Sequence, residues 1–429
     1  MKVLLFKPGT HDGSEHEMPN IGMGVVAAKS KQIGGEITVL DGHFANILAI
    51  PIPSIKEYDI VYLSLVSQEW NLLITQRFID EAKRCGKKVI VGGPHAGCYT
   101  DELRKDNRID FVEPWEIDDL DITPDYSDFI GIENAVTYGI ALSRGCTNSC
   151  NFCAASKLHG KWRKRDVEQA WKELDSVGQY PKVKLIHVVD DSFSADLDHA
   201  KHFLREYKRR GYPWKLNIMN VRADQIDIEL LELIKSVGCD ILAIGVESGD
   251  PFVFRKIGKG ESLSDIEDAI EMMHNVGITP WLNMIVGLPY ETKESATRSI
   301  QWAMDVPNPK IVHWFQYAPF KGTRAYNYFV KKGAIKDPYI PPAYGRRYDE
   351  LPWKSDFGTE EFTALDRELF QLEGYLRCKS PILINNVSHV MNLCIKHGMK
   401  ELFDEWKAKA PIEEYAKKSL PYKKQKGQV

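Results

Sequence analysis

The sequence lacks the features of a membrane-bound, secreted or nucleic-acid-coating protein. It has no uncharged apolar run of about 18 residues, which a membrane-spanning helix would need. Its first residues, MKVLLFKPGT, predict a strand rather than a signal peptide. Basic and acidic side chains number 56 and 60, for a net charge of -4, whereas nucleic-acid-binding surfaces are usually basic. We therefore expect a cytoplasmic protein without a membrane or nucleic-acid partner.

Cysteine is sparse and unevenly placed. The chain has eight cysteines in 429 residues, and three of them are Cys146, Cys150 and Cys153. A disulfide framework would spread its cysteines through a smaller, secreted chain. The clustering instead indicates a metal or redox centre in a reducing compartment.

The amino-terminal part alternates apolar strands with amphipathic helices. Strands are expected over residues 1–6, 36–41, 59–66, 87–93 and 109–114. This alternation predicts a parallel sheet with right-handed crossovers. Ligands of such sheets bind at the carboxyl ends of the strands. The candidate binding loops are therefore residues 7–24, 64–69 and 92–96.

A second alternating series begins after an acidic segment without periodicity. Six strands are expected at residues 138–143, 184–190, 214–220, 240–247, 280–287 and 311–319. Six strand–helix units predict an incomplete TIM-like barrel, because eight would close it. Each strand ends in polar or glycine-containing sequence, which places a pocket at the carboxyl edge.

The predicted fold class is α/β, with a Rossmann-like parallel sheet, a partial (β/α)6 TIM-like barrel and a helical tail. The predicted divisions are a sheet domain over residues 1–114, a linker over 115–136, the barrel over 137–333 and a mostly helical cap over 334–429. We find no chemistry in the tail.

The three clustered cysteines have the spacing C-x3-C-x2-C directly after an apolar strand. Structural zinc usually takes four ligands in two close pairs, and His159 is the candidate fourth ligand. Three thiolates on a short loop better suit a cubane [4Fe–4S] cluster, in which each iron is usually held by one cysteine. Three ligands leave one iron open, and Gly145 helps the chain turn into the loop.

This spacing resembles the radical S-adenosylmethionine (SAM) superfamily, and Phe152 matches the aromatic position before the third cysteine. The resemblance implies that Cys146, Cys150 and Cys153 hold a [4Fe–4S] cluster whose open iron binds SAM. It also implies reductive cleavage of SAM to methionine and a 5′-deoxyadenosyl radical, with a flavodoxin- or ferredoxin-type electron donor.

Further strand ends resemble SAM-binding motifs of that superfamily. The residues implied to bind SAM are Phe152, Arg222, Glu247, Ser248, Asn283 and Gly287. The alternative for Glu247 and Ser248 is a purely structural role, as a polar strand end with a capping serine. Two roles are equally compatible with Asp190 and Asp191: they face the substrate, or they cap the next helix.

The amino-terminal segments PNIGMGVVAA, YLSLV and VGGPHA resemble the cobalamin-binding class of radical SAM enzymes. That resemblance implies cobalamin over the sheet, with Ser64, Gly92, Gly93 and His95 as candidate contacts. It predicts a cobalamin-dependent C-methyltransferase that acts on an unactivated carbon of a small molecule or peptide. The residues identify neither the substrate nor a catalytic side chain.

Other functions stay open from the sequence. One alternative keeps the radical chemistry without cobalamin and gives a rearrangement, oxidation or cyclisation. Another is a cluster-containing redox sensor, which would not need Arg222, Glu247 and Gly287 around one pocket. A tRNA methylthiotransferase is not expected, because the amino-terminal domain has only Cys85 and Cys98 for a second cluster.

Overall fold

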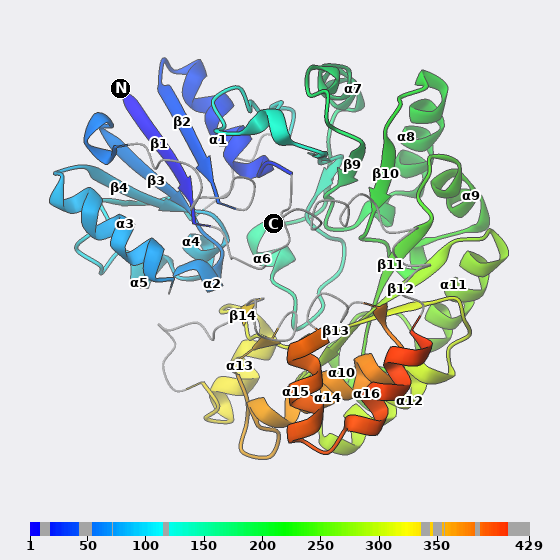
Figure 1. Cartoon of the computed structure of the whole chain (residues 1–429). Helices are drawn as coiled ribbons and strands as arrows, with labels where there is room; N and C mark the ends of the chain where they lie inside the picture. The colour runs from blue at the N-terminus through cyan, green and yellow to red at the C-terminus, as the bar shows by residue number, and fades with distance from the viewer. Residues whose placement is uncertain are drawn as a thin grey trace.

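The computed structural model describes residues 1–8, 18–42, 54–70, 72–114, 120–335, 344–345, 354–355, 357–381 and 387–410. A sheet lobe, blue in Figure 1, stands beside an incomplete ring of strands and helices, and the last helices pack beside the final strands. Among the described helices, none combines the length and apolar character that crossing a bilayer requires.

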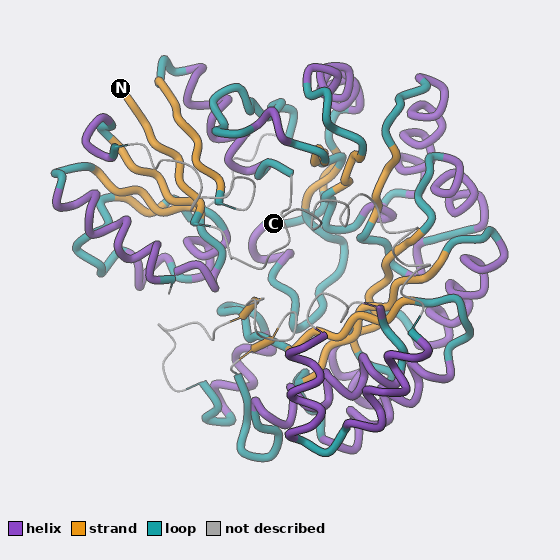
Figure 2. The backbone as a smooth tube through the Cα atoms, viewed as in Figure 1, coloured by secondary structure: helices purple, strands orange, loops and turns teal. Residues whose placement is uncertain are grey.

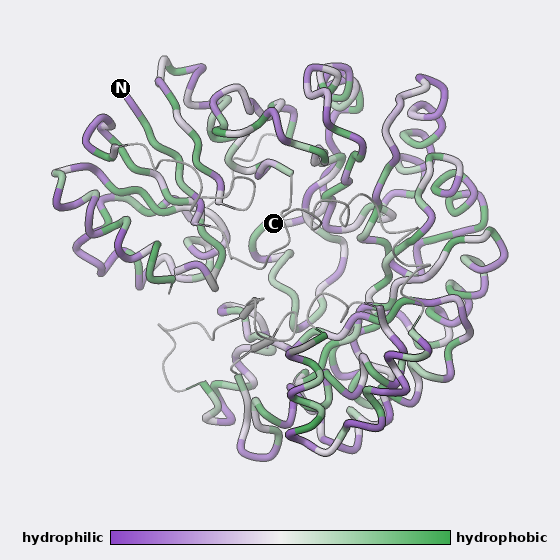
Figure 3. The backbone as a smooth tube through the Cα atoms, viewed as in Figure 1, coloured by the Kyte–Doolittle hydropathy of each residue, from purple (hydrophilic) through white to green (hydrophobic). Residues whose placement is uncertain are grey.

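The first lobe is a five-stranded parallel sheet in the order β2-β1-β3-β4-β5. Its strands are β1 (Lys2–Lys7), β2 (Glu36–Asp41), β3 (Ile60–Ser64), β4 (Lys88–Gly92) and β5 (Phe111–Val112). Its helices are α1 (Ile21–Gln32), α2 (Ser67–Trp70), α3 (Leu73–Arg84), α4 (Pro94–Cys98) and α5 (Thr100–Leu103). The strands are apolar along their length, as burial on both faces requires (Figure 3).

The barrel contains six parallel strands in two three-stranded sheets. The strands are β6 (Thr137–Ile140), β9 (Leu185–Val188), β10 (Lys215–Ile218), β11 (Ile241–Glu247), β12 (Thr279–Val286) and β13 (Ile311–Gln316). One sheet has the order β10-β9-β6 and the other β11-β12-β13, and a bridge between Val221 and Ile244 joins them. The predicted α/β fold with a partial barrel is confirmed.

Helices cover the outside of the barrel, as Figure 2 shows in purple around the orange strands. They are α7 (Val167–Ser176), α8 (Leu197–Arg210), α9 (Ile228–Ser236), α10 (Pro251–Ile257), α11 (Leu263–Asn275), α12 (Lys293–Asp305) and α13 (Arg324–Lys331). A continuous apolar core lies between these helices and the strands.

The predicted linker is more than a connection. Residues 115–119 lie outside the described part, but Phe129 forms a parallel bridge with Val39 beside β2. Tyr126 is 1% exposed and packs at the junction of the two lobes, where its ring fills the space that Gly24 leaves open. The sequence did not predict this packing, because the segment has no apolar periodicity and its contacts are to residues far away in the chain.

The carboxyl-terminal helices cover the open edge of the barrel. They are α14 (Ala364–Arg377), α15 (Val387–Lys396) and α16 (Lys400–Lys409), and Gly398 turns the chain between the last two with φ 72°. On α14, Gln371 and Tyr375 both donate hydrogen bonds to the carbonyl oxygen of Trp314, at 2.7 and 2.8 Å. Because β13 is an edge strand, these side chains replace part of a missing neighbour.

Candidate functional site

The three clustered cysteines lie on a loop at the carboxyl end of β6. Two short strands, β7 (Ser143–Arg144) and β8 (Arg163–Lys164), pair antiparallel and close this loop at its base. The short helix α6 (Ala155–Leu158) follows the third cysteine. The closed base holds all three thiols on one excursion of the chain.

Two carboxylates from the end of β9 hold the entry to this loop. Asp190 accepts hydrogen bonds from the backbone N–H of Leu142 (2.7 Å) and the hydroxyl of Ser143 (2.6 Å). Asp191 accepts from the backbone N–H of Gly145 at 2.8 Å. These contacts show a role that neither alternative named, because the carboxylates anchor the cysteine loop.

Gly145 is required by its conformation and by its surroundings. Its φ of 79° is the left-handed conformation that favours glycine. A Cβ there would lie 2.6 Å from the carbonyl oxygen of Lys161 and 2.7 Å from that of Gly160. The turn predicted at this glycine therefore also brings the two ends of the loop together.

The thiols have the surroundings of cluster ligands. Backbone N–H groups of Asn148 and Ala155 donate to the sulfurs of Cys146 and Cys153, both at 3.4 Å. Burial raises the pKa of the Cys150 thiol, so it needs a metal or positive charge to ionise. Lys259 and Arg222 supply part of that charge.

The donor set fits a cluster better than a single ion. Within the described residues, no three His, Cys, Asp or Glu side chains are grouped so that they could hold one metal ion. A zinc ion needs all its ligands to converge on one point, whereas a cubane cluster takes each thiolate at a different iron. His159, the candidate zinc ligand, lies 3.9 Å from Asp191 instead.

Charged side chains from the end of β11 and from the segments after β10 and α10 lie beside Cys150. Arg222 forms two hydrogen bonds with Asp224, both 2.9 Å, and lies 3.6 Å from Glu261. Lys259 lies 2.7 Å from Glu261 and 3.6 Å from Glu247. The sequence motifs identified Arg222 and Glu247, but they missed Lys259 and Glu261, whose side chains are 6% and 0% exposed.

Glu247 is aimed by an unusual backbone. Its φ is 68°, and the register of β11 against β12 shifts between Gly245 and Glu247. Such a conformation is costly for a residue with a Cβ, and a bulge re-aims the side chain that follows it. Burial raises the pKa of Glu247, while the ammonium of Lys259 opposes that change.

Other predicted SAM residues have protein partners. The Ser248 hydroxyl lies 3.1 Å from that of Ser299 and accepts from the N–H of Asp250, the residue that caps α10. The Asn283 side chain accepts from the indole of Trp281 at 3.0 Å. Phe152 packs against a small apolar cluster. Their contacts to SAM stay predictions.

Gly287 accommodates a side chain from the tail. A Cβ on Gly287, whose φ is 94°, would lie 2.6 Å from the guanidinium carbon of Arg367 on α14. Glu291 accepts from the backbone N–H of Gly287, and burial raises its pKa to about 7. Burial also lowers the pKa of Arg367 to about 10. The sequence showed no role for the tail because nothing near Arg367 in the chain indicates this contact.

At the carboxyl edge of the first sheet, the predicted cobalamin residues pack against the protein itself. A Cβ on Gly92 would lie 2.1 Å from the hydroxyl of Tyr62. A Cβ on Gly93, whose φ is 83°, would lie 3.2 Å from the hydroxyl of Ser64. These glycines allow the loops to pack closely, and their contacts to a corrin stay predictions.

His95 is enclosed in an aromatic stack. Its ring lies 5.2 Å from that of Trp70 and 4.8 Å from that of Tyr99, and the residue is 1% exposed. Burial lowers the pKa of His95 to about 3, so the ring is neutral. The contact of His95 to a corrin stays a prediction. Residues 9–17, 43–53 and 115–119, which follow other strands, lie outside the described part.

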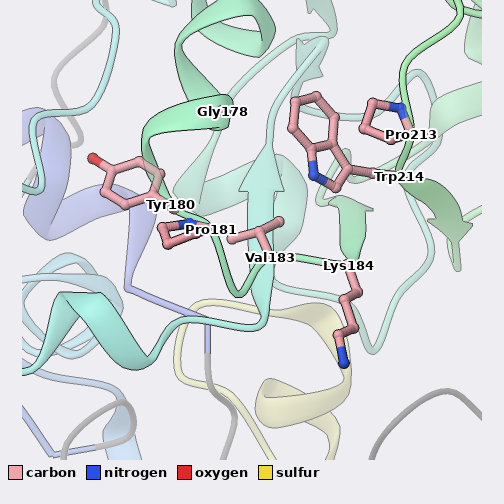
Figure 4. A pocket seen from close by; sticks show the side chains of 7 residues that line it. All are labelled: Gly178, Tyr180, Pro181, Val183, Lys184, Pro213 and Trp214. Carbon is pink, nitrogen blue, oxygen red and sulfur yellow. The ribbon is translucent and has the colours of Figure 1, made fainter.

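A shallow hollow lies away from the thiol loop. Its volume is about 360 Å³, and Figure 4 shows its lining side chains. The lining residues are Gly178, Tyr180, Pro181, Val183, Lys184, Pro213 and Trp214. They precede β9 and β10, so the hollow is at the amino-terminal ends of the strands and takes no part in the carboxyl-edge site.

The barrel segment matches a known family. Residues 140–303 match the Radical SAM superfamily, so this segment is a radical SAM domain and the resemblance carried by the cysteines is confirmed. A [4Fe–4S] cluster and SAM are the cofactors of such a domain, and the thiol loop described above fits them.

Curated relatives match part of the chain. An uncharacterized methyltransferase of Pyrococcus horikoshii is 26% identical over 277 residues, which cover 63% of this chain and 58% of that protein. The ribosomal protein uS12 methylthiotransferase RimO of Thermotoga petrophila is 26% identical over 303 residues, covering 64% of this chain and 68% of RimO. The match thus spans a little over half of the methyltransferase.

Solved structures share the fold over most of the chain. The cobalamin-dependent SAM radical enzyme OxsB with aqua-cobalamin bound superposes with a TM-score of 0.66 at 14% identity, covering 96% of this chain and 79% of OxsB. The radical SAM methyltransferase TsrM of Kitasatospora setae, with cobalamin and a [4Fe-4S] cluster, gives 0.60 at 16% identity and 78% coverage of each chain. At these identities the likeness is one of fold.

Proposed function

We propose that this chain is a cobalamin-dependent radical SAM enzyme that methylates an unactivated carbon. One observation carries the proposal: the loop after β4 packs against the loop that holds the cysteines. A Cβ on Gly97 of α4 would lie 3.0 Å from the side chain of Leu158 on α6, which begins two residues after Cys153. The two candidate cofactor edges therefore meet.

An ion pair supports the same junction. Lys321, after β13, pairs with Glu102 on α5, and its ammonium lies 5.4 Å from the ring centre of Tyr99. Lys157 of α6 donates to the carbonyl oxygen of Lys321 at 3.3 Å. These contacts support a methyl carrier on the sheet that would act together with the SAM site.

The charged side chains beside Cys150 suit SAM, which carries a sulfonium, an ammonium and a carboxylate. Arg222 and Lys259 are positive, and Asp224, Glu247 and Glu261 are negative, so the group has a formal charge of -1. Arg222 already donates from two nitrogens to Asp224, so its remaining N–H groups would meet the SAM carboxylate, and Glu247 would accept from the ammonium. These residues would bind and orient SAM beside the thiol loop.

The two cofactors would supply the reactive chemistry when bound. The cluster would supply an electron for the cleavage of SAM, and cobalamin would supply the methyl group that it carries. The chain itself would bind SAM, and it holds the thiol loop through Asp190 and Asp191. The substrate that we propose is a small molecule or peptide, in a reducing, cytoplasmic setting.

A second candidate keeps the radical chemistry and uses the first sheet only as a scaffold. The observation that favours it is the enclosed His95 ring, together with Gly92 and Gly93, whose open sides are filled by the chain. In that case the reaction would be a rearrangement, oxidation or cyclisation.

Anaerobic reconstitution separates these functions. We expect iron, sulfide, a corrinoid with visible absorbance, and 5′-deoxyadenosine on addition of SAM and dithionite. Methyl transfer from methyl-labelled SAM to an acceptor would support the first candidate. 5′-Deoxyadenosine without any corrinoid binding would support the second. A fully loaded cluster that never cleaves SAM would overturn both and favour a redox sensor.

A further inference from the structure

Two helices hold the middle of the cysteine loop by its backbone. Asn151 lies between Cys150 and Cys153, and its backbone N–H donates to the carbonyl oxygen of Ile257 at 3.0 Å. The side-chain amide of Asn151 donates to the carbonyl oxygen of Lys256 at 2.8 Å. From α13, the N–H of Ala325 donates to the carbonyl oxygen of Asn151 at 2.9 Å. The ends of α10 and α13 thus lie directly against the loop.

Aromatic and basic side chains are exposed on α10, on α13 and in the turn between β12 and α12. Phe252 is 48% exposed and Tyr290 is 41% exposed. The ammonium of Lys256 lies 5.5 and 5.6 Å from the centres of these two rings, and the Tyr290 ring lies 4.5 Å from that of Tyr328. We call Phe252, Arg255, Lys256, Tyr290 and Tyr328 the thiol-loop patch. Exposed aromatic rings grouped with basic side chains are typical of protein interfaces.

The charge of this region is opposite to that of the whole chain. The sequences of α10 and α13, PFVFRKI and RAYNYFVK, contain Arg255, Lys256, Arg324 and Lys331 and no acidic residue. The full chain has a net charge of -4. A local positive surface on such a chain attracts and orients an acidic partner.

We propose that the thiol-loop patch docks an acidic electron-transfer protein that carries a reduced flavin or iron–sulfur group. The proposal rests on the proposed radical SAM function, which consumes an electron each time SAM is cleaved. Electron transfer slows steeply with distance, and this patch lies on and beside the two helices that touch the backbone between the cysteines. Charge complementarity selects an acidic protein as the occupant.

The electron balance is simple. The donor would be oxidised by one electron, which a cluster held by Cys146, Cys150 and Cys153 would supply to the sulfonium of SAM. The C5′–S bond then breaks, giving methionine and the 5′-deoxyadenosyl radical. No other reductant is needed, and a chemical reductant such as dithionite can replace the donor because it needs no docking surface.

A charge-reversal variant tests the patch. The variant carries Arg255→Glu and Lys256→Glu, whose side chains lie outside the SAM site. The affinity of the reconstituted enzyme for reduced flavodoxin is measured by titration at low salt. The dissociation constant of the variant should be about 10-fold higher or more. Formation of 5′-deoxyadenosine driven by flavodoxin should fall similarly, whereas the dithionite-driven rate should stay within about twofold.

The control is Lys208→Glu, an exposed lysine on α8, which lies across the molecule from α13 (Figure 1). It changes net charge by the same amount per substitution and should leave flavodoxin binding almost unchanged. Equal weakening by patch and control variants would overturn the proposal in favour of general charge attraction. Equal loss with both reductants would also overturn it, because the patch would then serve the site itself.

The two proposals fail in different ways. If the wild type binds flavodoxin through the patch but dithionite yields no 5′-deoxyadenosine, the radical function fails and the docking surface stands. If SAM is cleaved but flavodoxin binding ignores the patch, the docking proposal fails alone.

Discussion

The carboxylate of Asp191 accepts a hydrogen bond of 2.8 Å from the backbone N–H of Gly145, the residue before the first clustered cysteine. The contact joins the end of β9 to the start of the thiol loop. It sets where the loop leaves the barrel, so it positions the cysteines without touching them.

Asp191→Ala should loosen the thiol loop and lower the iron bound after anaerobic reconstitution. The substitution removes the carboxylate that accepts the hydrogen bond from the Gly145 N–H. This loss should lower the free energy of unfolding by about 1–3 kcal/mol. Asp191→Asn is the control, because its amide oxygen still accepts the hydrogen bond. Full iron content in the alanine variant, measured per chain, would show that the loop holds its shape without this contact.

Cys150→Ala should abolish both the cluster and the cleavage of SAM, because a cubane held by two thiolates is labile. Iron and sulfide analysis and 5′-deoxyadenosine formation check this. Cys239→Ala is the matched control: Cys239 is 3% exposed in the barrel core, and its removal should leave the iron content unchanged. Retention of full iron and activity in Cys150→Ala would disprove the ligand assignment.

Gly287→Ala should destabilise the fold and weaken SAM binding. The new Cβ meets the Arg367 guanidinium at 2.6 Å and the backbone has φ 94°, so strain and clash together should cost roughly 2–4 kcal/mol. Gly277→Ala separates the two effects, because its φ is 73° and its Cβ would meet nothing within 4 Å. Urea unfolding and SAM titration of both variants give the comparison, and equal losses would exclude a role for Arg367.

Asp190 should give the apo-protein a pH-dependent stability. Burial raises the pKa of Asp190 from 3.8 to about 6, so the folded chain keeps a proton that the unfolded chain releases. The free energy of unfolding should therefore fall by up to roughly 3 kcal/mol as the pH rises from about 4 to about 6, and this term should be constant above that.

Asp190→Asn removes this titration. The difference in unfolding free energy between wild type and variant should therefore change with pH inside that window only. Urea unfolding of both proteins at several pH values between about 4 and 8 provides the measurement. Parallel curves across the window would show that Asp190 does not titrate there.

Much of the fold was predictable from local patterns. Apolar runs separated by helical segments located the strands of the sheet and the six strands of the barrel, because burial dictates the spacing of apolar residues. Within the mostly helical cap that the sequence predicts, the bounds of α15 and α16 came only from the structure, where Gly398 adopts a positive φ between them. The packed segment around Tyr126 was missed because it has no period.

The site was predictable only in part. Cys146, Cys150 and Cys153 were found because their chemistry requires a short spacing, which is visible in the chain itself. The sequence did not identify Lys259, Glu261 and Arg367, because the role of each depends on contacts that form only in the folded chain.

The order of the amino acids alone determined that three thiolates share one loop at the end of a barrel strand, and with that the class of chemistry. Tertiary structure alone decided that Asp190 and Asp191 hold that loop, that His95 lies within an aromatic stack, and that the tail reaches Gly287. The physical reason is range: ligand spacing and apolar periodicity are local properties, whereas hydrogen-bond partners, burial and charge pairing exist only once distant segments have packed together.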